Sequence, residues 1–162
     1  MICDGLFGAY PTEHRKAAMP EFLDLHSKTT KAIRALAEEA MQRHGLHLGQ
    51  NHLLAALWER DGRTPGEIAA ALRVATPTVV KMATRMTATG LLIRRPDDRD
   101  NRLVRLWLTD AGRVLRKPIE AERRSIEEKI TADLTATERK HLLSALAKIN
   151  RSASGLLTGF ID

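Results

Sequence analysis

Two helix starts of the same design, close together in the middle of the chain, most constrain its fold. Thr64 is followed by proline, glycine and glutamate, and Thr76 is also followed directly by proline. A threonine hydroxyl can accept from an unpaired N–H of the first turn, and a proline there lacks the N–H that would have no partner. We therefore expect a short helix over residues 65–72 and a second helix, capped by Thr76, that runs to about residue 89 and is ended by Gly90.

The second of these helices has two different faces. An apolar stripe at helical spacing is formed by Val79, Met82, Ala83 and Met86. The opposite stripe, with Val80 and Thr84 beside it, is formed by Thr78, Lys81, Arg85 and Ala88. Two short helices joined by residues 73–75 are a helix-turn-helix unit, whose second helix enters the major groove of DNA. There lysine or arginine can bond a guanine, threonine a base edge, and valine a thymine methyl group.

The periodicity changes to that of strands directly after this helix. Residues 91–95 and 102–108 are predicted strands, joined by a polar tip over residues 96–101. Five arginines lie on or beside the predicted hairpin: Arg94, Arg95, Arg99, Arg102 and Arg105. The net charge of +6 is thus concentrated next to the basic helix face, which favours nucleic acid as the partner.

Arginines on such a hairpin suit the negative potential of a narrow minor groove. Three aspartates are interspersed among them: Asp97, Asp98 and Asp100. We expect the Asp100 carboxylate to hold Arg102 in place two residues further on, which pre-sets the arginine fork.

Longer helices are predicted on both sides of this unit. Residues 21–45, 49–60 and 111–131 show helical patterns, with a bend expected at Pro118. A further capping pattern at Thr135 opens a last helix to about residue 152. Aromatic residues make up only 4% of the chain, which favours packed helices over a large sheet. The expected fold is mainly α-helical with a small β-hairpin wing, in the order α-α-α-α-β-β-α-α.

The predicted organisation has three parts. Residues 1–20 are expected to be a flexible N-terminal arm, residues 47–110 a winged helix-turn-helix domain, and residues 21–46 and 111–162 a helical dimerisation region. The helices after the hairpin carry more apolar surface than a small winged domain could cover, in particular Leu115, Ile119, Ile126, Ile130, Leu142, Leu143, Leu146, Ile149, Leu156 and Leu157. We expect a second copy of the chain to cover it, since a two-fold homodimer also matches a palindromic DNA site.

From about residue 48 to residue 113 the chain resembles the MarR-type transcriptional regulators, the multiple-antibiotic-resistance regulator family. The resemblance rests on the runs TPGEIAAAL, ATPTVVKMATRM, GLLIRRPDDRDNR and LVRLWLTDAG, taken in this order. The most specific part is the hairpin, where Arg-Arg-Pro is followed by Asp-x-Arg and a strand that ends in Leu-Thr-Asp-x-Gly. The flanking helices match more loosely.

The resemblance implies a homodimer that reads an inverted-repeat operator, and we expect a repressor. It places the contacts of the recognition helix on Thr76, Pro77, Thr78, Lys81 and Arg85. It places the wing-tip arginine on Arg102, with Asp100 as its partner, and backbone contacts on Arg94, Arg95 and Arg99. Ala75 and Val80 replace residues that are often polar in the family, so the base sequence read should differ. Family members often bind small aromatic acids between the dimer base and the winged domain, which makes a small-molecule effector possible.

Simpler interpretations compete with this one. A solvated surface helix also has a charged face, and the arginines and aspartates of the hairpin could form a salt-bridged loop. An architectural or purely protein-binding winged domain would keep the fold without reading a base sequence. Salt-dependent preference for a palindrome over scrambled DNA distinguishes these classes.

Other activities find less support in the sequence. His44, His47 and His52 lie near Glu38 and Glu39, but structural zinc needs four ligands at set distances, so ordinary surface histidines are the simpler interpretation. Cys3 is the only cysteine, with no obvious basic neighbour to lower its pKa, so neither a disulfide nor an oxidant sensor is favoured.

No recognised catalytic motif is present, so we expect neither an enzyme nor a bound cofactor. The chain has no nucleophile elbow, no phosphate-binding glycine loop and no His-Glu-x-x-His. No apolar run reaches the roughly 18 residues of a membrane span, and the first twenty residues lack the order of a secretory signal. A cytoplasmic protein is the expectation.

Overall fold

The computed structural model describes residues 21–100 and 102–158 of the 162-residue chain. The predicted arm over residues 1–20, and with it Cys3, lies outside the described residues. The chain divides into two compact units, whose boundary falls inside the first helix, between Leu36 and Ala37.

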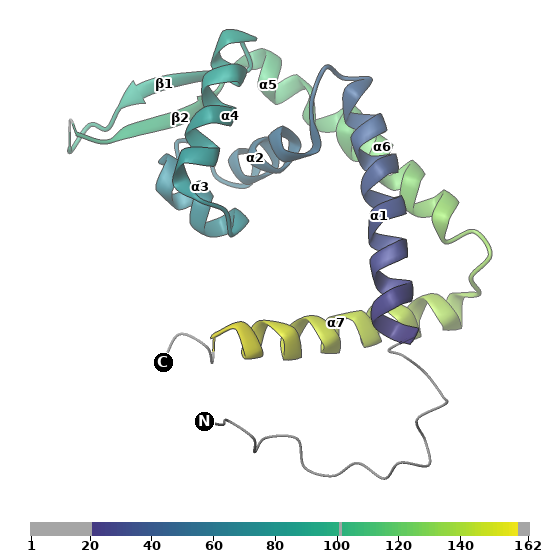
Figure 1. The fold of residues 1–162 in the computed structure, drawn as a ribbon. Helices are drawn as coiled ribbons and strands as arrows, with labels where there is room; N and C mark the ends of the chain where they lie inside the picture. The colour runs from purple at the N-terminus through teal and green to yellow at the C-terminus, as the bar shows by residue number, and fades with distance from the viewer. Residues whose placement is uncertain (1–20, 101, 159–162) are drawn as a thin grey trace, which may run out of the picture. The chain divides into compact units, whose positions relative to one another are not determined.

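The described residues form helices and one antiparallel hairpin, in an order that follows the prediction except for one additional break in a helix (Figure 1). The elements are α1 (Glu21–Gln42), α2 (Leu48–Glu59), α3 (Pro65–Leu72), α4 (Thr76–Ala88), β1 (Leu92–Pro96), β2 (Val104–Leu108), α5 (Asp110–Val114), α6 (Arg116–Ile130) and α7 (Ala136–Thr158). The fold class, mainly α-helical with a two-stranded wing, is confirmed. The last helix continues past the predicted residue 152 to Thr158.

In the first unit, residues 21–36 form the larger part of α1, as predicted. All their side chains are exposed, including the apolar Phe22, Leu25 and Ile33. Local contacts support the helix: Lys28 Nζ lies 2.7 Å from Asp24 Oδ2, one turn away. The apolar stripe predicted from the spacing is therefore present, and it is open to solvent in the single chain.

The second unit begins where α1 ends, and that end is set by Gly45. The Leu46 N–H donates to the Met41 carbonyl at 3.0 Å and the Gly45 N–H to the Gln42 carbonyl at 2.9 Å, with Gly45 at φ +68°. These two bonds make a Schellman motif, which needs a left-handed residue that glycine adopts without strain. The same pair of bonds, around Gly90, ends α4. The stop predicted at Gly90 is confirmed, and Gly45 ends α1 in the same way.

The core of this unit lies between α2, α3, α4 and the hairpin. Its most completely buried residues include Leu53, Leu54 and Leu57 of α2, Ile68 of α3, and Leu106 of β2. The predicted inward stripe of α4 is confirmed by Val79, Ala83 and Met86, all at 0% exposure. On α3 the buried positions are not evenly spread. Ala71 is exposed and Ala69 is buried, because the helix packs against α2 and α4 with a face turned toward Ala69.

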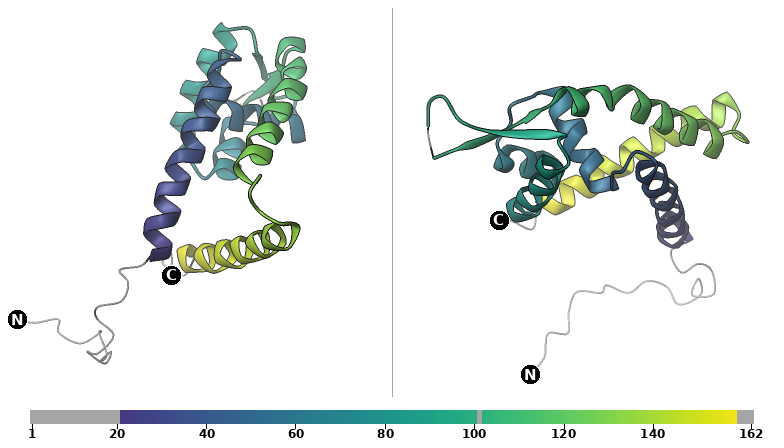
Figure 2. Two further views of the ribbon diagram at one scale, coloured as in Figure 1. Left: turned by 90° about the vertical axis from the view of Figure 1, so that its right-hand side faces the viewer. Right: turned by 90° about the horizontal axis from the view of Figure 1, so that it is seen from above.

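The hairpin pairs Leu92 with Leu108 at its base and Pro96 with Val104 near its tip. Leu106 also donates its N–H to the Arg63 carbonyl, a bridge from the α2–α3 loop that the sequence did not indicate. In Figure 1 and in the right view of Figure 2 the hairpin extends beyond α4. Its base is thus fixed to the helical body, and its tip projects from it.

Trp107 of β2 packs on the loop between α2 and α3. A Cβ built on Gly62 would lie 2.5 to 2.9 Å from three atoms of the indole ring, and Gly62 has φ +71°. Only glycine meets both requirements at that position. The Trp107–Gly62 contact is therefore a second attachment of β2 to the helical body, beside the Arg63 bridge.

The helix predicted over residues 111–131 is interrupted at Leu115, which separates α5 from α6. Pro118 is the cause, because it has no N–H to donate to the Val114 carbonyl and its ring crowds that carbonyl. The bend expected at Pro118 is thus confirmed, one turn before the proline. No helix among the described residues is long and apolar enough to cross a membrane.

Candidate nucleic-acid interface

The exposed side of α4 carries the basic residues that the sequence placed there. Thr78, Lys81 and Arg85 are all exposed, and Val80 keeps 41% of its surface. The opposite side of the helix is buried, so these side chains cannot turn inward without unpacking the core. The predicted division of α4 into two faces is therefore confirmed, and the basic face is open to a partner.

The N-terminus of α4 differs from the prediction. Ala75, and not Thr76, is the N-cap, with extended φ −68° and ψ 139°, and no side chain caps the helix there. Thr76 and Pro77 already belong to the first turn, and both are exposed. The expectation of a threonine cap was wrong because the helix begins one residue earlier. Pro77 has no N–H and the Thr78 N–H donates to the Ala75 carbonyl at 2.9 Å, so this helix start offers a phosphate fewer N–H groups than a usual helix N-terminus.

The turn that leads into α4 contains Arg73 in the left-handed conformation, at φ 53° and ψ 48°. It is the one non-glycine residue with positive φ among those described. The Val74 N–H donates to the Ala69 carbonyl at 3.0 Å, and the Arg73 N–H donates to the Ala70 carbonyl at 3.3 Å. These two bonds again make a Schellman motif. The helix-turn-helix geometry is therefore held by main-chain bonds of the turn itself.

At the start of α3 the predicted capping box is confirmed. The Glu67 N–H donates to Thr64 Oγ1 at 3.2 Å, and the Thr64 N–H donates to Glu67 Oε2 at 2.7 Å. The Thr64 N–H lowers the pKa of the Glu67 carboxyl, and Arg60, 2.6 Å away, lowers it further. A charged Glu67 therefore stabilises the first turn of the helix that supports α4.

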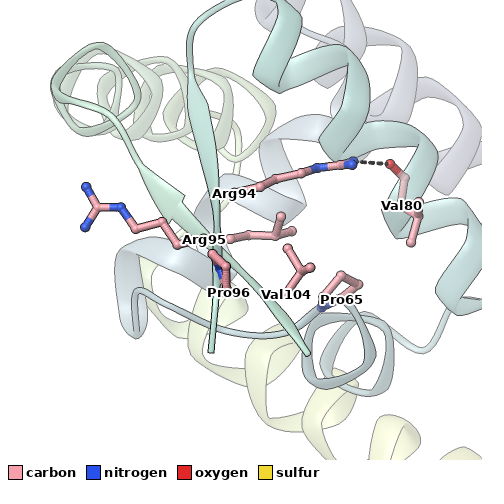
Figure 3. A pocket seen from close by; sticks show the side chains of 7 residues that line it. Pro65, Val80, Arg94, Arg95, Pro96 and Val104 are labelled. Atoms are coloured by element: carbon pink, nitrogen blue, oxygen red, sulfur yellow. Dashed lines mark hydrogen bonds between the residues drawn. The ribbon is translucent and has the colours of Figure 1, made fainter. Parts of the chain in front are cut away.

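Arg94 of β1 contacts α4 directly (Figure 3). Its Nη2 group donates to Thr84 Oγ1 at 2.6 Å and to the Val80 carbonyl at 3.2 Å, and the Thr84 hydroxyl donates to the same carbonyl. Arg95, the next residue, points away from α4. The two neighbouring arginines thus differ: Arg94 connects the hairpin to α4, and Arg95 is free to face a partner.

A hollow of about 330 Å³ lies beneath the Arg94 contact (Figure 3). It is lined by Pro65, Val80, Arg94, Arg95, Pro96, Val104 and Leu106. Its walls are mostly apolar, and Arg94 provides a guanidinium at one side. The hollow lies between α4 and the hairpin, the two elements predicted to face DNA.

The hairpin tip is organised by carboxylates. Arg99 and Arg102 are both exposed. The Asp100 carboxylate accepts from the backbone N–H of Arg102 at 3.0 Å. Asp100 thus holds Arg102 through its main chain, and the expected bond to the guanidinium fork is replaced by this one.

Asp97 and Arg105 are the pair that sequence reasoning missed. Arg105 Nε donates a very short hydrogen bond to Asp97 Oδ2, and this bond, followed by the N–H of Arg99, lowers the pKa of the Asp97 carboxyl. The hairpin pairing that brings Arg105 beside the tip is defined only in the folded structure, where Arg105 lies opposite Arg95. From the sequence, only Asp100 was expected to position an arginine.

The histidines near the start of α2 have separate roles. His47 Nδ1 lies 2.6 Å from Glu38 Oε1, and the Leu48 N–H donates to Glu38 Oε2 at 2.9 Å. His44 Nε2 lies 3.7 Å from Glu122 Oε1 on α6. Within residues 21–100 and 102–158, no three His, Cys, Asp or Glu side chains come together as a metal site would require.

The contact between Arg94 and Thr84 gives a first prediction. Thr84→Val and Arg94→Gln are each expected to weaken DNA binding about three- to tenfold, and the double variant no further, because both remove the same link between hairpin and α4. Thr84→Ser keeps the hydroxyl and should bind as the wild type does. Affinities from a titration with labelled duplex measure this. Losses that simply add would mean that Arg94 acts on DNA without Thr84.

A helix-turn-helix with an attached hairpin, a buried inner face on α4 and a basic outer face define a winged helix-turn-helix protein, a DNA-binding fold. The sequence pattern of the MarR family matches residues 46–104. The DNA-binding region of the chain thus matches the MarR family, whose members are transcriptional regulators and not enzymes.

Individual relatives agree with this assignment. The transcriptional repressor MdtR of Bacillus subtilis (strain 168) is 29% identical over 115 residues, which cover 71% of this chain and 74% of MdtR. The crystal structure of a MarR family transcription regulator superimposes with a TM-score of 0.78 at 21% identity, over 85% of this chain and 91% of the other. MepR of S. aureus, solved as a complex with DNA, has a TM-score of 0.69 at 23% identity, over 83% and 99% of the two chains.

Proposed function

We propose that this regulator is a homodimer that binds an inverted-repeat operator in a sequence-specific manner and acts as a repressor. The carrying observation is the exposed basic face of α4, held in place by the opposite face, where Val79, Ala83 and Met86 are fully buried. The N-terminal half of α4 enters the major groove in this proposal, with base contacts from Thr76, Pro77, Thr78, Val80, Lys81 and Arg85. The S. aureus MepR–DNA complex supports DNA as the partner, and the repressor name of MdtR supports repression.

The wing occupies the flanking minor groove in this proposal. Arg95, Arg99 and Arg102 are exposed and can reach phosphates or the groove itself. Arg94 and Asp100 act inside the protein, through Thr84 and through the main chain of Arg102. Of the proposed wing residues, three thus face DNA and two orient the others.

Exposed apolar side chains support the homodimer. Leu142, Leu143, Leu146 and Ile149 of α7 keep between 39% and 57% of their surface, at helical spacing. Exposed apolar stripes of this kind mark interaction surfaces, and a two-fold partner would bury them. We keep residues 21–46 and 111–162 as the proposed dimerisation region and residues 47–110 as the DNA-binding domain.

The proposal includes a response to a small molecule, at the hollow between α4 and the hairpin. The hollow of about 330 Å³ between α4 and the hairpin is at the lower end of the range of ligand pockets, about 300–1,000 Å³. A small apolar molecule with a negative group would fit its apolar walls and Arg94. A cytoplasmic location belongs to the same proposal, as the place where the DNA is found.

The test is selection of DNA from a random-sequence pool by the purified full-length protein. We expect an inverted repeat with half-sites about one helical turn apart, bound at least about 10³-fold more tightly than a scrambled duplex. Light scattering should give twice the 18.0 kDa chain mass. Equal affinity for the two duplexes would indicate an architectural module. If the protein shows no salt-dependent binding to DNA, a protein-binding module would be indicated instead. A monomeric mass would contradict the dimer.

A further inference from the structure

Asp97 is unusual among the charged residues of the hairpin because it is buried. Its side chain is 6% exposed, and it is one of two buried polar or charged residues in the described chain, with Asn51. The neighbouring Asp98, Arg99 and Asp100 are all exposed. A buried carboxylate is retained only where bonds replace its lost hydration, so Asp97 must be fully engaged within the protein.

One oxygen of Asp97 shapes the tip. Oδ1 accepts the backbone N–H of Arg99 at 2.9 Å and that of Asp100 at 3.0 Å. The Asp97 N–H donates to the Leu103 carbonyl at 2.9 Å, which closes the loop from the other side. The main chain that carries Arg99 is therefore folded around this side chain.

The other oxygen connects the tip to the body of the domain. Oδ2 accepts from Arg105 Nε, and Arg105 Nη1 donates to the Gly62 carbonyl at 2.8 Å. The same Nη1 lies 3.6 Å from Glu67 Oε2, the carboxylate that caps α3. A continuous series of polar contacts thus runs from the wing tip through Asp97 and Arg105 to the start of the helix-turn-helix.

We propose that Asp97, together with Arg105, is the positioning residue of the wing: it sets where Arg99 and Arg102 stand relative to α4, and so to DNA. The inference rests on the proposed function. Asp97 touches no nucleic acid in this arrangement and acts only through the arginines that it places. Its own charge is offset by Arg105, so it does not repel the phosphates as an exposed aspartate would.

The neighbouring Asp97 and Asp98 make this inference testable. A purely electrostatic role and a positioning role of Asp97 predict opposite changes in DNA affinity when its charge is removed. Removing either negative charge should strengthen DNA binding if long-range electrostatics decides. If Asp97 positions the wing, Asp97→Asn weakens DNA binding. In one orientation the amide NH₂ group faces the Arg105 guanidinium, and in the other it faces the N–H groups of Arg99 and Asp100, so one set of bonds is lost in either case. Asp98→Asn, on the exposed neighbour, removes the same charge without this effect.

The experiment compares wild type, Asp97→Asn, Asp98→Asn, Arg105→Lys and Arg102→Ala on the operator selected by the wild-type protein. Affinity is measured over a salt series, with thermal melting as the check on folding. Arg105→Lys leaves the net charge unchanged but cannot reach both Asp97 and Gly62. Arg102→Ala supplies the reference for loss of one wing arginine.

We expect Asp97→Asn and Arg105→Lys to bind about tenfold more weakly, with a salt slope shallower by about one for each arginine withdrawn from phosphate. Asp98→Asn should bind as tightly as the wild type or more tightly. A purely structural defect would lower the active fraction and leave the salt slope unchanged. If Asp97→Asn does not fold, Arg105→Lys carries the test.

Two results would overturn the inference: Asp97→Asn or Arg105→Lys binding like Asp98→Asn, or weaker binding with the wild-type salt slope. A wild-type protein that does not discriminate operator from scrambled DNA is a different outcome. It would overturn the proposed function and this inference with it, before any variant is compared.

Discussion

Gly112→Ala is expected to destabilise the protein by about 3 kcal/mol, at the upper end of what overpacking costs. A Cβ at this buried position would overlap the carbonyl oxygen of Leu91 and approach Leu108 Cδ2 to 3.2 Å. That carbonyl cannot move easily, because it accepts the N–H of Thr109, the N-cap of α5, at 3.1 Å. The Gly112 carbonyl is also occupied, by Trp58 Nε1 at 3.0 Å.

The steric nature of this effect is checked by a second glycine. Gly66 lies in the first turn of α3 and is exposed, and a Cβ there would meet only Thr64 Oγ1, at 3.9 Å. Gly66→Ala should therefore raise stability by about 0.5–1 kcal/mol, as alanine does in a helix. Denaturant unfolding followed by circular dichroism, at one fixed protein concentration, measures both. A Gly112→Ala midpoint equal to that of the wild type would contradict the packing around Leu91.

Removing both cations from the exposed face of α4 is expected to abolish most of the sequence preference. Lys81→Ala and Arg85→Ala should each weaken operator binding by about 1–3 kcal/mol if the side chain bonds a guanine. The two losses should nearly add, because the residues lie one helical turn apart and would contact different bases. The fold should persist, since both side chains are exposed and the opposite face carries the core.

A titration against operator and scrambled duplex separates base reading from simple attraction. Loss of a base contact lowers the preference for the operator, whereas loss of a phosphate contact lowers both affinities equally. Lys117→Ala is the matched control, because Lys117 is exposed on α6 and loses the same charge away from α4. Operator binding by Lys81→Ala and Arg85→Ala at wild-type strength would remove these residues from the proposed reading face.

Much of the local structure could be predicted because its causes are local. A capping box lies within four residues, and a glycine stop depends on the φ of that glycine. The roles of Thr64, Gly45 and Gly90 therefore follow from nearby residues alone. Helical periodicity likewise gave the faces of α4, which burial confirmed. The start of α4 was misplaced by one residue because Thr76-Pro77 fits both the cap and the first turn.

The candidate site was predictable as a set of residues and not as an arrangement. Arg94 and Arg95 are identical in a sequence, yet one bonds Thr84 of α4 and the other points away. Asp97 resembles Asp98, yet only Asp97 is buried. Such differences depend on which partner comes near from elsewhere in the chain, and spacing along one strand does not contain that information.

By itself the amino-acid sequence determined the elements, their order, the basic face of α4 and the arginine-rich hairpin, since each follows from neighbouring residues. Only the tertiary structure decided how the hairpin is attached: through Arg105 to Gly62, through Trp107 on the same glycine, and through Arg94 to Thr84. Each of these contacts joins residues at least ten positions apart in the sequence. Each therefore depends on packing geometry that is defined only once the core has formed.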